Sequence, residues 1–177
     1  EKWVSYIKNT FAQVAPNFTT ARMIRDYQDR FYNPQADRTA RLSKSDYKLA
    51  KEMAEWKRTL LNAWDQIEVK SVQITDGITN VLKIGEVYPA RVVVDIKNLK
   101  PEDLKVEMVI TENGETGRPG LVDCLPFSVE SVNGQIITYK LELNLMNAGA
   151  FGYAIRILPN HPELPHRQDF PYLKWVH

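Results

Sequence analysis

The chain has 177 residues, is 44% hydrophobic and 25% charged, and agrees in composition with a soluble protein that has one core, or one core and a smaller helical unit. Because 23 basic residues balance 22 acidic ones without forming a basic stripe, nucleic acid is not an expected partner. The single cysteine, Cys124, excludes an intrachain disulfide and CxxC sites, which fits a reducing cytoplasm, and no apolar run approaches the ~20 residues needed to span a membrane.

The first predicted element is an amphipathic helix that runs to Val14. Its apolar residues recur at spacings of three and four, and so share one face: Trp3, Ile7, Phe11 and Val14. Pro16 is predicted to end this helix. Because residue 1 is Glu and the helical period is already present there, we expect the chain to be a cut piece of a longer protein.

A second helix is predicted after Pro16, with Thr19 or Thr20 as its N-cap. Its apolar stripe consists of Ile24, Tyr27 and Phe31. Asn33-Pro34 is predicted to end this helix, because proline cannot donate the helical hydrogen bond.

A polar connector is predicted over Gln35–Leu42, followed by a third helix. Ser43 is expected to cap this helix, and Asp46 to face the positive end of its dipole. The apolar face of the third helix consists of Leu49, Met53, Trp56, Leu60 and Trp64. We expect this face to dock on another part of the protein.

From Ile67 onward the hydrophobic period falls to two, which predicts β-strands. Strands are expected over 67–74 (one strand or a kinked pair), 92–96, 104–110 with one buried face, 121–132, 136–143 and 151–158. Asn133-Gly134 predicts a hairpin with a type I′ turn. About seven short strands without helices between them predict an antiparallel sandwich of the immunoglobulin type.

The expected fold class is therefore α + β. Residues 1–65 form the helical part, and residues 66–177 form an immunoglobulin-like β-sandwich.

The histidines, the cysteine and the carboxylates of the chain show no catalytic or metal-binding pattern. His161, His166 and His177 lie in or after a proline-rich tail at spacings that fit no metal site. Cys124 is expected to be a small core residue. The carboxylates have no paired partner that would predict a glycosidase site: Glu102 and Asp103 in a turn, and Asp123 and Glu130 on strands. We expect no catalytic, cofactor-binding or metal-binding residue in this chain.

Aromatic residues offer one alternative, because sugars stack on exposed aromatic rings. Tyr139 and Tyr153 fall on the apolar phase of their strands, so we expect both to be buried, with the 151–158 strand central to the core. Trp56 and Trp64 are expected in the core or an interface. A weak glycan contact is left open at Tyr172 and Trp175.

Two segments resemble a known family. The stretch PNFTTARMIRDYQDRFY, from Pro16 to Tyr32, is similar to the closing helix of the catalytic domain of α-glucan (glycogen) phosphorylases, with Phe18, Arg22 and Tyr27 at matching positions. FGYAIRILPNHPEL, from Phe151 to Leu164, is similar to the C-terminal segment of the longer bacterial and archaeal members. Trp175 also lies where that lineage carries a tryptophan.

The resemblance implies that the intact enzyme transfers glucose from an α-1,4-glucan to phosphate, giving glucose 1-phosphate, with pyridoxal phosphate as cofactor. The family holds this cofactor on a lysine within E-A-S-G-T-S-N-M-K, and no stretch of this chain resembles that motif. The chain is therefore expected to be a non-catalytic C-terminal fragment of a cytoplasmic enzyme.

The same resemblance implies that Ile24, Tyr27 and Phe31 dock on the missing catalytic lobes, with Arg22 pairing with a carboxylate there. Without the lobes, we expect self-association or packing on the sandwich to cover these side chains. A free-standing glycan-binding module and an oligomerising domain are the two alternatives.

Overall fold

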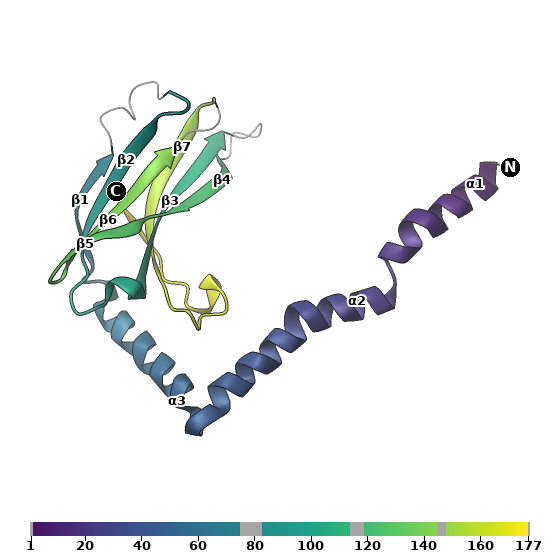
Figure 1. Ribbon diagram of the computed structural model, residues 1–177, viewed down its shortest axis with the longest axis horizontal. Coiled ribbons are helices and arrows are strands. Elements are labelled where there is room, and N and C mark those ends of the chain that lie inside the picture. Colours follow the sequence, from purple (N-terminus) through teal and green to yellow (C-terminus); the bar gives the residue numbers. More distant parts are fainter. Residues whose placement is uncertain (1, 75–82, 114–118, 145–147, 177) are drawn as a thin grey trace. The chain divides into compact units, whose positions relative to one another are not determined.

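The computed structural model describes residues 2–74, 83–113, 119–144 and 148–176 (Figure 1). The chain divides into two compact units, Glu1–Glu55 and Trp56–His177. The last turns of the third helix thus belong to the unit that contains the strands. The domain boundary expected between residues 65 and 66 stays a prediction.

The first unit is helical. Its elements are α1 (Lys2–Asn9), the π-helical turn η1 (Thr10–Val14), the 3-10 turn η2 (Ala15–Asn17), α2 (Thr20–Tyr27), the π-helical turn η3 (Gln28–Tyr32) and most of α3 (Asn33–Trp64). Thr19 caps α2 as predicted, since its hydroxyl accepts a hydrogen bond from the backbone N–H of Arg22 at 3.2 Å. The break at Pro16 is also confirmed, because η2 separates the first two helices there.

The helix end predicted at Asn33-Pro34 is wrong. The chain continues from η3 directly into α3, so the segment predicted to be a polar connector, Gln35–Leu42, is helical. The wider π-helical turn immediately before Pro34 is a known way for a helix to absorb an irregularity in its hydrogen-bond ladder. A proline in the first turn of a helix is also tolerated, because its missing N–H has no partner to lose there.

The actual break in α3 lies at Lys44–Tyr47. Lys44 is extended, with ψ 150°, and the next three residues are left-handed, with φ values of 52°, 55° and 58° for Ser45, Asp46 and Tyr47. Left-handed backbone costs roughly 1–2 kcal/mol for each residue that has a Cβ atom. Ser43 does not cap a new helix, because its hydroxyl donates back to the carbonyl of Thr39 at 2.7 Å.

The second unit is a sandwich of two antiparallel four-stranded sheets, as predicted. One sheet has the order β1-β2-β6-β5, with β1 Glu68–Ile74, β2 Val87–Asp95, β6 Ile136–Asn144 and β5 Ser128–Asn133. The other has the order β4-β3-β7-β8, with β4 Pro119–Pro126, β3 Leu104–Asn113, β7 Phe151–Pro159 and β8 Lys174–Val176. In immunoglobulin lettering these orders are A-B-E-D and C′-C-F-G, which confirms the immunoglobulin-like arrangement.

Two strand predictions need correction. The strand expected over 121–132 is two strands in different sheets, because the chain crosses between sheets at Pro126-Phe127. Phe127 enters the core there, and its N–H donates to the carbonyl of Val106. The short strand β8 was not predicted. Of the two alternatives for the first strand, the structure shows the single strand, β1, with an irregularity in its register between Val69 and Ser71.

The predicted hairpin joins β5 to β6. Asn133 pairs with Ile136, so the two central residues of the turn are Gly134 and Gln135. Only Gly134, with φ +59°, has a positive φ in this turn. That pattern is typical of a type II′ turn, so the predicted type I′ turn is wrong although the hairpin itself is confirmed.

The core lies between the two sheets and the end of α3. Leu60 and Trp64 of α3 join the buried residues of both sheets in one cluster. Tyr139 is buried, and β7 lies between β3 and β8, so both predictions are confirmed. Tyr153 is 43% exposed, which contradicts the predicted burial. It alternates in phase with Ile155 and Ile157, but it lies near the start of β7, where the strand extends past the buried part of the core.

Candidate functional site

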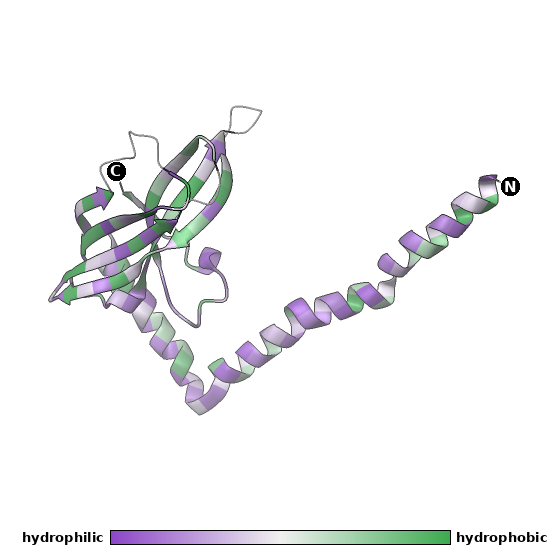
Figure 2. Cartoon of the chain, turned by 45° about the horizontal axis from the view of Figure 1, so that its top comes forward, coloured by the Kyte–Doolittle hydropathy of each residue, from purple (hydrophilic) through white to green (hydrophobic). Residues whose placement is uncertain are grey.

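An exposed apolar surface lies on α2 and η3. Ile24, Tyr27 and Phe31 are 48%, 46% and 58% exposed. Their spacing of three and four residues places them on one side of the helical path. We call these three residues the aromatic helix face. Figure 2 shows hydrophobic residues recurring along this helical unit between hydrophilic ones.

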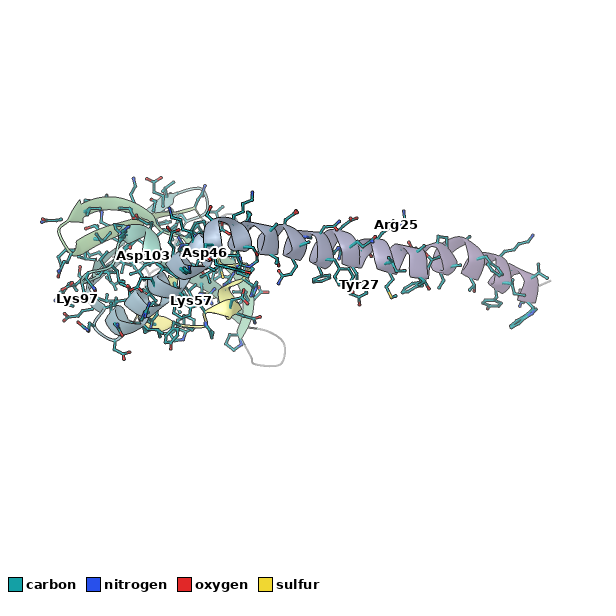
Figure 3. All side chains as sticks on the ribbon, turned by 90° about the horizontal axis from the view of Figure 1, so that it is seen from below. Arg25, Tyr27, Asp46, Lys57, Lys97 and Asp103 are labelled. Atoms are coloured by element: carbon teal, nitrogen blue, oxygen red, sulfur yellow. The ribbon has the colours of Figure 1, made fainter. Side chains whose placement is uncertain are left out.

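Local ring contacts order the aromatic helix face. The ring centroids of Tyr27 and Phe31 lie 5.8 Å apart, and Tyr27 also stacks on Tyr32 with a centroid distance of 6.3 Å. Figure 3 shows Tyr27 and Arg25 projecting from different sides of this helix. Tyr27 therefore lies on the apolar side of this helix, and Arg25 lies on a different side.

Arg22 lies two residues before Ile24 on α2, so a period of 3.6 residues per turn places it on about the opposite side of the helix from the aromatic helix face. Its guanidinium group lies 5.8 Å from the centroid of the Phe18 ring, and its Nη1 lies 3.5 Å from an oxygen of Asp26. Within this chain its partners are thus an aromatic ring and a carboxylate one turn away. The pairing of Arg22 with a carboxylate outside the chain stays a prediction.

Other apolar residues continue the exposed surface toward the N-terminus. The predicted stripe of the first helix is exposed at each of its positions, Trp3, Ile7, Phe11 and Val14. Leaving a large apolar side chain in water forfeits roughly 1.5–3 kcal/mol relative to its burial. A run of such residues is typical of a surface that is covered in the functional protein.

The two predicted glycan contacts, Tyr172 and Trp175, have different surroundings. The ring of Tyr172 packs against Trp64 at 5.7 Å and against Phe170 at 4.9 Å. Trp175 lies on β8, opposite Arg156 of β7, and is 43% exposed. Within the residues that the structure describes, no ring contact joins Tyr172 to Trp175. They do not form one aromatic platform.

Trp56 and Trp64 are structural, as predicted. Trp64 is buried, and Trp56 packs against the core cluster. The indole N–H of Trp56 donates to an oxygen of Asp103 at 2.9 Å. Its ring also contacts His161 at 4.7 Å and Phe170 at 5.6 Å.

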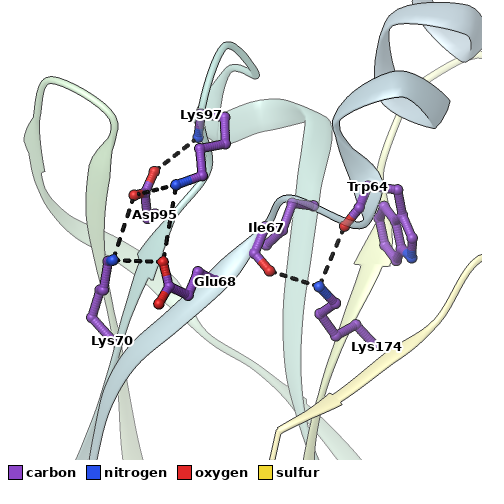
Figure 4. Close-up of polar contacts among 7 residues, drawn as sticks. All are labelled: Trp64, Ile67, Glu68, Lys70, Asp95, Lys97 and Lys174. Atoms are coloured by element: carbon purple, nitrogen blue, oxygen red, sulfur yellow. Dashed lines mark hydrogen bonds and ion pairs between the residues drawn. The ribbon is translucent and has the colours of Figure 1, made fainter.

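Lys174 ties the C-terminal strand to the end of α3. Its ammonium group donates to the carbonyl of Ile67 at 2.6 Å and lies 3.4 Å from that of Trp64 (Figure 4). A lysine at the C-terminal end of a helix satisfies carbonyls that have no partner within the helix. This contact positions β8, and with it Trp175.

Sequence reasoning missed a buried carboxylate on β3. Alternation predicted one buried face for this strand, yet Glu107 and Val109 on the opposite face are also buried. Glu107 accepts hydrogen bonds from Arg156 at 2.8 and 3.0 Å, and its other oxygen lies 2.6 Å from the ammonium group of Lys105. Arg167 lies 3.8 Å away. The pairing of Glu107 with Arg156 follows from the β3–β7 register, which the sequence does not reveal.

The surroundings of Glu107 change its acidity. Burial by itself raises the pKa of this carboxyl group, but hydrogen bonds and charges from Lys105 and Arg156 outweigh that effect, so the pKa lies below its usual value. The guanidinium group of Arg156 also donates to the sulfur of Cys124 at 3.4 Å. This cluster is a charge-compensated structural site, because its donors and its acceptor are directed at one another.

The remaining polar candidates are held by local contacts. The Nδ1 atoms of His161 and His166 accept backbone N–H groups of Glu163 and Gln168. Asp123 accepts the N–H of Cys124, and Glu130 forms a two-point ion pair with Arg91 at 2.7 and 2.8 Å. Among the described residues no group of three metal-ligating side chains occurs, and His177 lies outside those residues. None of the described helices is long and apolar enough to cross a membrane.

Comparison with known proteins agrees with the resemblance seen in the sequence. Residues 64–177 match the family described as the glycogen phosphorylase C-terminal domain. The chain is 31% identical to maltodextrin phosphorylase of Thermococcus litoralis, over 98% of this chain and 20% of that protein. It is 29% identical to glycogen phosphorylase of Mycobacterium tuberculosis, over 93% of this chain and 19% of that protein. The chain thus spans about a fifth of the length of these relatives.

Proposed function

The chain belongs to the glycogen phosphorylase C-terminal domain family, and from this premise we propose that it is the non-catalytic C-terminal part of an α-glucan phosphorylase. The intact enzyme would carry out phosphorolysis of an α-1,4-glucan to glucose 1-phosphate in the cytoplasm. The helical unit docks on the catalytic lobes, and the sandwich is a scaffold. The coverage of about a fifth of each relative supports this assignment.

The single observation that carries the docking role is the exposed aromatic helix face. Ile24, Tyr27 and Phe31 are together large enough to contribute several kcal/mol if a partner covers them, at roughly 1.5–3 kcal/mol per side chain. The catalytic lobes of the same polypeptide are the proposed partner, because the chain represents only a fifth of its relatives. Arg22, on another side of α2, is proposed to pair with a carboxylate of the lobes and so to help set the orientation of docking.

The experiment is complementation in trans. The remaining part of the enzyme is expressed without this segment, and binding of the purified 177-residue chain is measured by calorimetry. We expect Ile24→Ala/Tyr27→Ala/Phe31→Ala to weaken binding by about 100-fold or more, given the apolar area that each side chain loses. Val132→Ala is the matched control, because Val132 is an equally exposed apolar residue of the sandwich. Equal binding by the triple variant and the control would refute the docking role.

Pyridoxal phosphate would be held by the missing part of the enzyme. Its lysine motif has no counterpart in this chain, so no residue here is assigned to the cofactor. We therefore expect the purified chain to bind no pyridoxal phosphate and to release no glucose 1-phosphate from maltodextrin and phosphate. Schiff-base absorbance or phosphorolysis by the purified chain would overturn this assignment.

A second candidate function is glycan binding by the sandwich. The observation that favours it is Trp175, whose indole ring is 43% exposed on an edge strand next to Arg156. Titration with maltoheptaose tests this function. Millimolar or tighter binding that is lost in Trp175→Ala and kept in Leu173→Ala would favour a glycan-binding module over a scaffold, since Leu173 is exposed to a similar degree.

A further inference from the structure

The two sheets of the sandwich differ on the faces that point away from the core. On the β1-β2-β6-β5 sheet this outer face carries paired charges, Arg91 with Glu130 and Lys140 with Glu142. A polar outer face of this kind is usual for an antiparallel sheet that packs on one side only. The outer face of the β4-β3-β7-β8 sheet is different, because most of it is apolar.

Strand register brings two rows of uncharged residues together on that face. Directly paired residues lie on the same side of a sheet, and here that side is opposite to Met108 and Ile155 of the core. Trp175 of β8 lies on the same side, opposite Arg156 in the neighbouring row. Figure 1 shows β4, β3 and β7 side by side. We call Trp175 and the two rows the apolar sheet face; the rows are Cys124, Val109 and Ala154, and Leu121, Thr111 and Gly152.

The apolar sheet face is incompletely covered within the chain. Val109 is buried at its centre, but Leu121 and Trp175 are 66% and 43% exposed. We propose that this face docks on the catalytic lobes of the same polypeptide, which rests on the function proposed above. The sandwich then has a contact of its own with the lobes, in addition to the contact of the aromatic helix face.

A basic rim borders the apolar sheet face in the row of Trp175. Glu107 is buried there, and three basic side chains lie within 4 Å of its oxygens, those of Arg156, Lys105 and Arg167. Among these four residues three positive charges meet one negative charge, and Lys105 and Arg167 are 43% and 54% exposed. The complementary surface is therefore apolar, with carboxylates where it meets this rim.

Size and charge favour the lobes over a second copy of the chain. Four strands and the seven rows of Lys105–Thr111 cover about 450 Å² on each side of a contact, or about 900 Å² in total. This area is typical of contacts between domains of one polypeptide and is small for separate proteins, which bury about 1,600 Å². The chain spans a fifth of the length of its relatives, so the lobes supply ample surface. A second copy would bring a second basic rim and no excess of carboxylates.

The experiment is hydroxyl-radical footprinting of the free 177-residue chain and of the complete polypeptide. We expect the oxidation rates of Leu121 and Trp175 to fall, in the complete polypeptide, to those of the buried Leu104 and Trp64. Val132 of β5 is the control and should keep its rate, because it is exposed and lies outside the apolar sheet face. Unchanged rates at Leu121 and Trp175 would overturn the proposal.

The same measurement tests the docking of the helical unit separately. Tyr27 and Phe31 report on the aromatic helix face, which is exposed in the free chain. If they stay reactive in the complete polypeptide while Leu121 and Trp175 are protected, the docking role of the helical unit fails and the sheet contact stands. The opposite pattern refutes the sheet contact alone.

Variants test whether the exposed residues hold the contact. Cys124 lies within the apolar sheet face, so its alkylation by iodoacetamide should be slower in the complete polypeptide than in the free chain. Leu121→Ser/Trp175→Ser should restore the free-chain rate. The matched control, Val129→Ser/Val132→Ser, changes two residues of similar exposure on β5 and should leave alkylation slow. Equal alkylation rates in the two double variants would contradict the proposal.

The basic rim is tested with a second matched pair. Arg167→Gln should speed the alkylation of Cys124 in the complete polypeptide, whereas Lys140→Gln, on the outer face of the other sheet, should not. Sedimentation of the free chain tests the other occupants. Dimers that are lost in Leu121→Ser/Trp175→Ser would identify a second copy as the occupant and overturn the proposal. Protection of Trp175 by maltoheptaose in the free chain would do the same in favour of a glycan.

Discussion

The sandwich and the helical unit contain similar apolar residues but differ in what those residues contact. In the sandwich the apolar sides of two sheets and the end of α3 close on one another, and Trp64 and Tyr139 are 6% and 2% exposed. In the helical unit Trp3 and Tyr27 are 74% and 46% exposed. A periodic apolar face therefore predicts that burial is favourable, but it does not identify the second surface that provides it.

Because the apolar residues of the two units contact different surfaces, they should contribute to different free energies, those of unfolding and of binding. Residues of the sandwich core should determine the free energy of unfolding of this chain, because their contacts are made within it. Residues of the aromatic helix face should contribute little to that free energy and much to binding, because their contacts require a partner. Matched substitutions in the two units test whether they differ in this way.

The largest contrast is expected between two tryptophans. Trp64→Ala should lower the free energy of unfolding by about 3–5 kcal/mol, because it leaves a cavity beside Leu60 and removes the ring contact with Tyr172. Trp3→Ala should change it by no more than about 0.5 kcal/mol. Urea unfolding followed by circular dichroism measures both values. A large loss for Trp3→Ala would show that the first helix is packed in solution.

A pair of tyrosines tests the same contrast inside the sandwich. Tyr139→Ala should cost about 3–5 kcal/mol, since the ring is buried and its hydroxyl donates to the carbonyl of Pro101 at 3.4 Å. Tyr153→Ala should cost about 1 kcal/mol, because its ring is 43% exposed. Urea midpoints of the two variants check this order. Equal losses would mean that the start of β7 is more enclosed than the structure shows.

Substitution of two glutamates compares the loss of a buried ion pair with the loss of a surface ion pair. Glu107→Ala should destabilise the chain by about 2–3 kcal/mol, because it leaves Arg156 without the carboxylate that pairs with it in a largely buried position. Glu130→Ala removes the partner of Arg91 at the surface and should lower the free energy of unfolding much less, because solvent screens this pair. Thermal unfolding measured in low and high salt separates the two, since only the surface pair should be screened.

Because the pKa of Glu107 is lowered in the folded chain, the free energy of unfolding should depend on pH in the acidic range. Because the folded-state pKa lies below the ordinary value of 4.5, the contribution of this group is present above that pH and is lost as the pH falls toward the folded-state pKa. The difference in urea midpoint between the unmodified chain and Glu107→Gln should therefore shrink between pH 7 and pH 3. A constant difference would exclude Glu107 as a source of acid sensitivity.

A small effect is also expected at the β5–β6 turn. Gly134 has φ +59°, and a Cβ atom built there meets no atom within 4 Å. Gly134→Ala should therefore cost about 1 kcal/mol from backbone conformation alone. Thermal unfolding measures this loss. A loss of 3 kcal/mol or more would point to a steric conflict that the structure does not show.

Local patterns predicted much of the sandwich and little of the helical path. Strict alternation located β6 and β7 to within a residue or two, because a strand with one buried side leaves a period of two in the sequence. The N-cap at Thr19 was also recognisable from residue type. The continuation of the helix past Pro34 was not, since proline is compatible with the first turn of a helix as well as with its end.

Local residue patterns were enough to predict a helical part followed by strands, the family that the chain resembles and the apolar stripe of the aromatic helix face. Each of these depends on residue types at short spacings, which can be recognised without knowledge of the fold. The three-dimensional structure was needed to show that Glu107 is buried beside Arg156, that Tyr153 is exposed while Tyr139 is not, and that the chain changes sheets at Phe127. These features depend on strand register and on which surfaces meet, and both arise from contacts between residues far apart in the sequence.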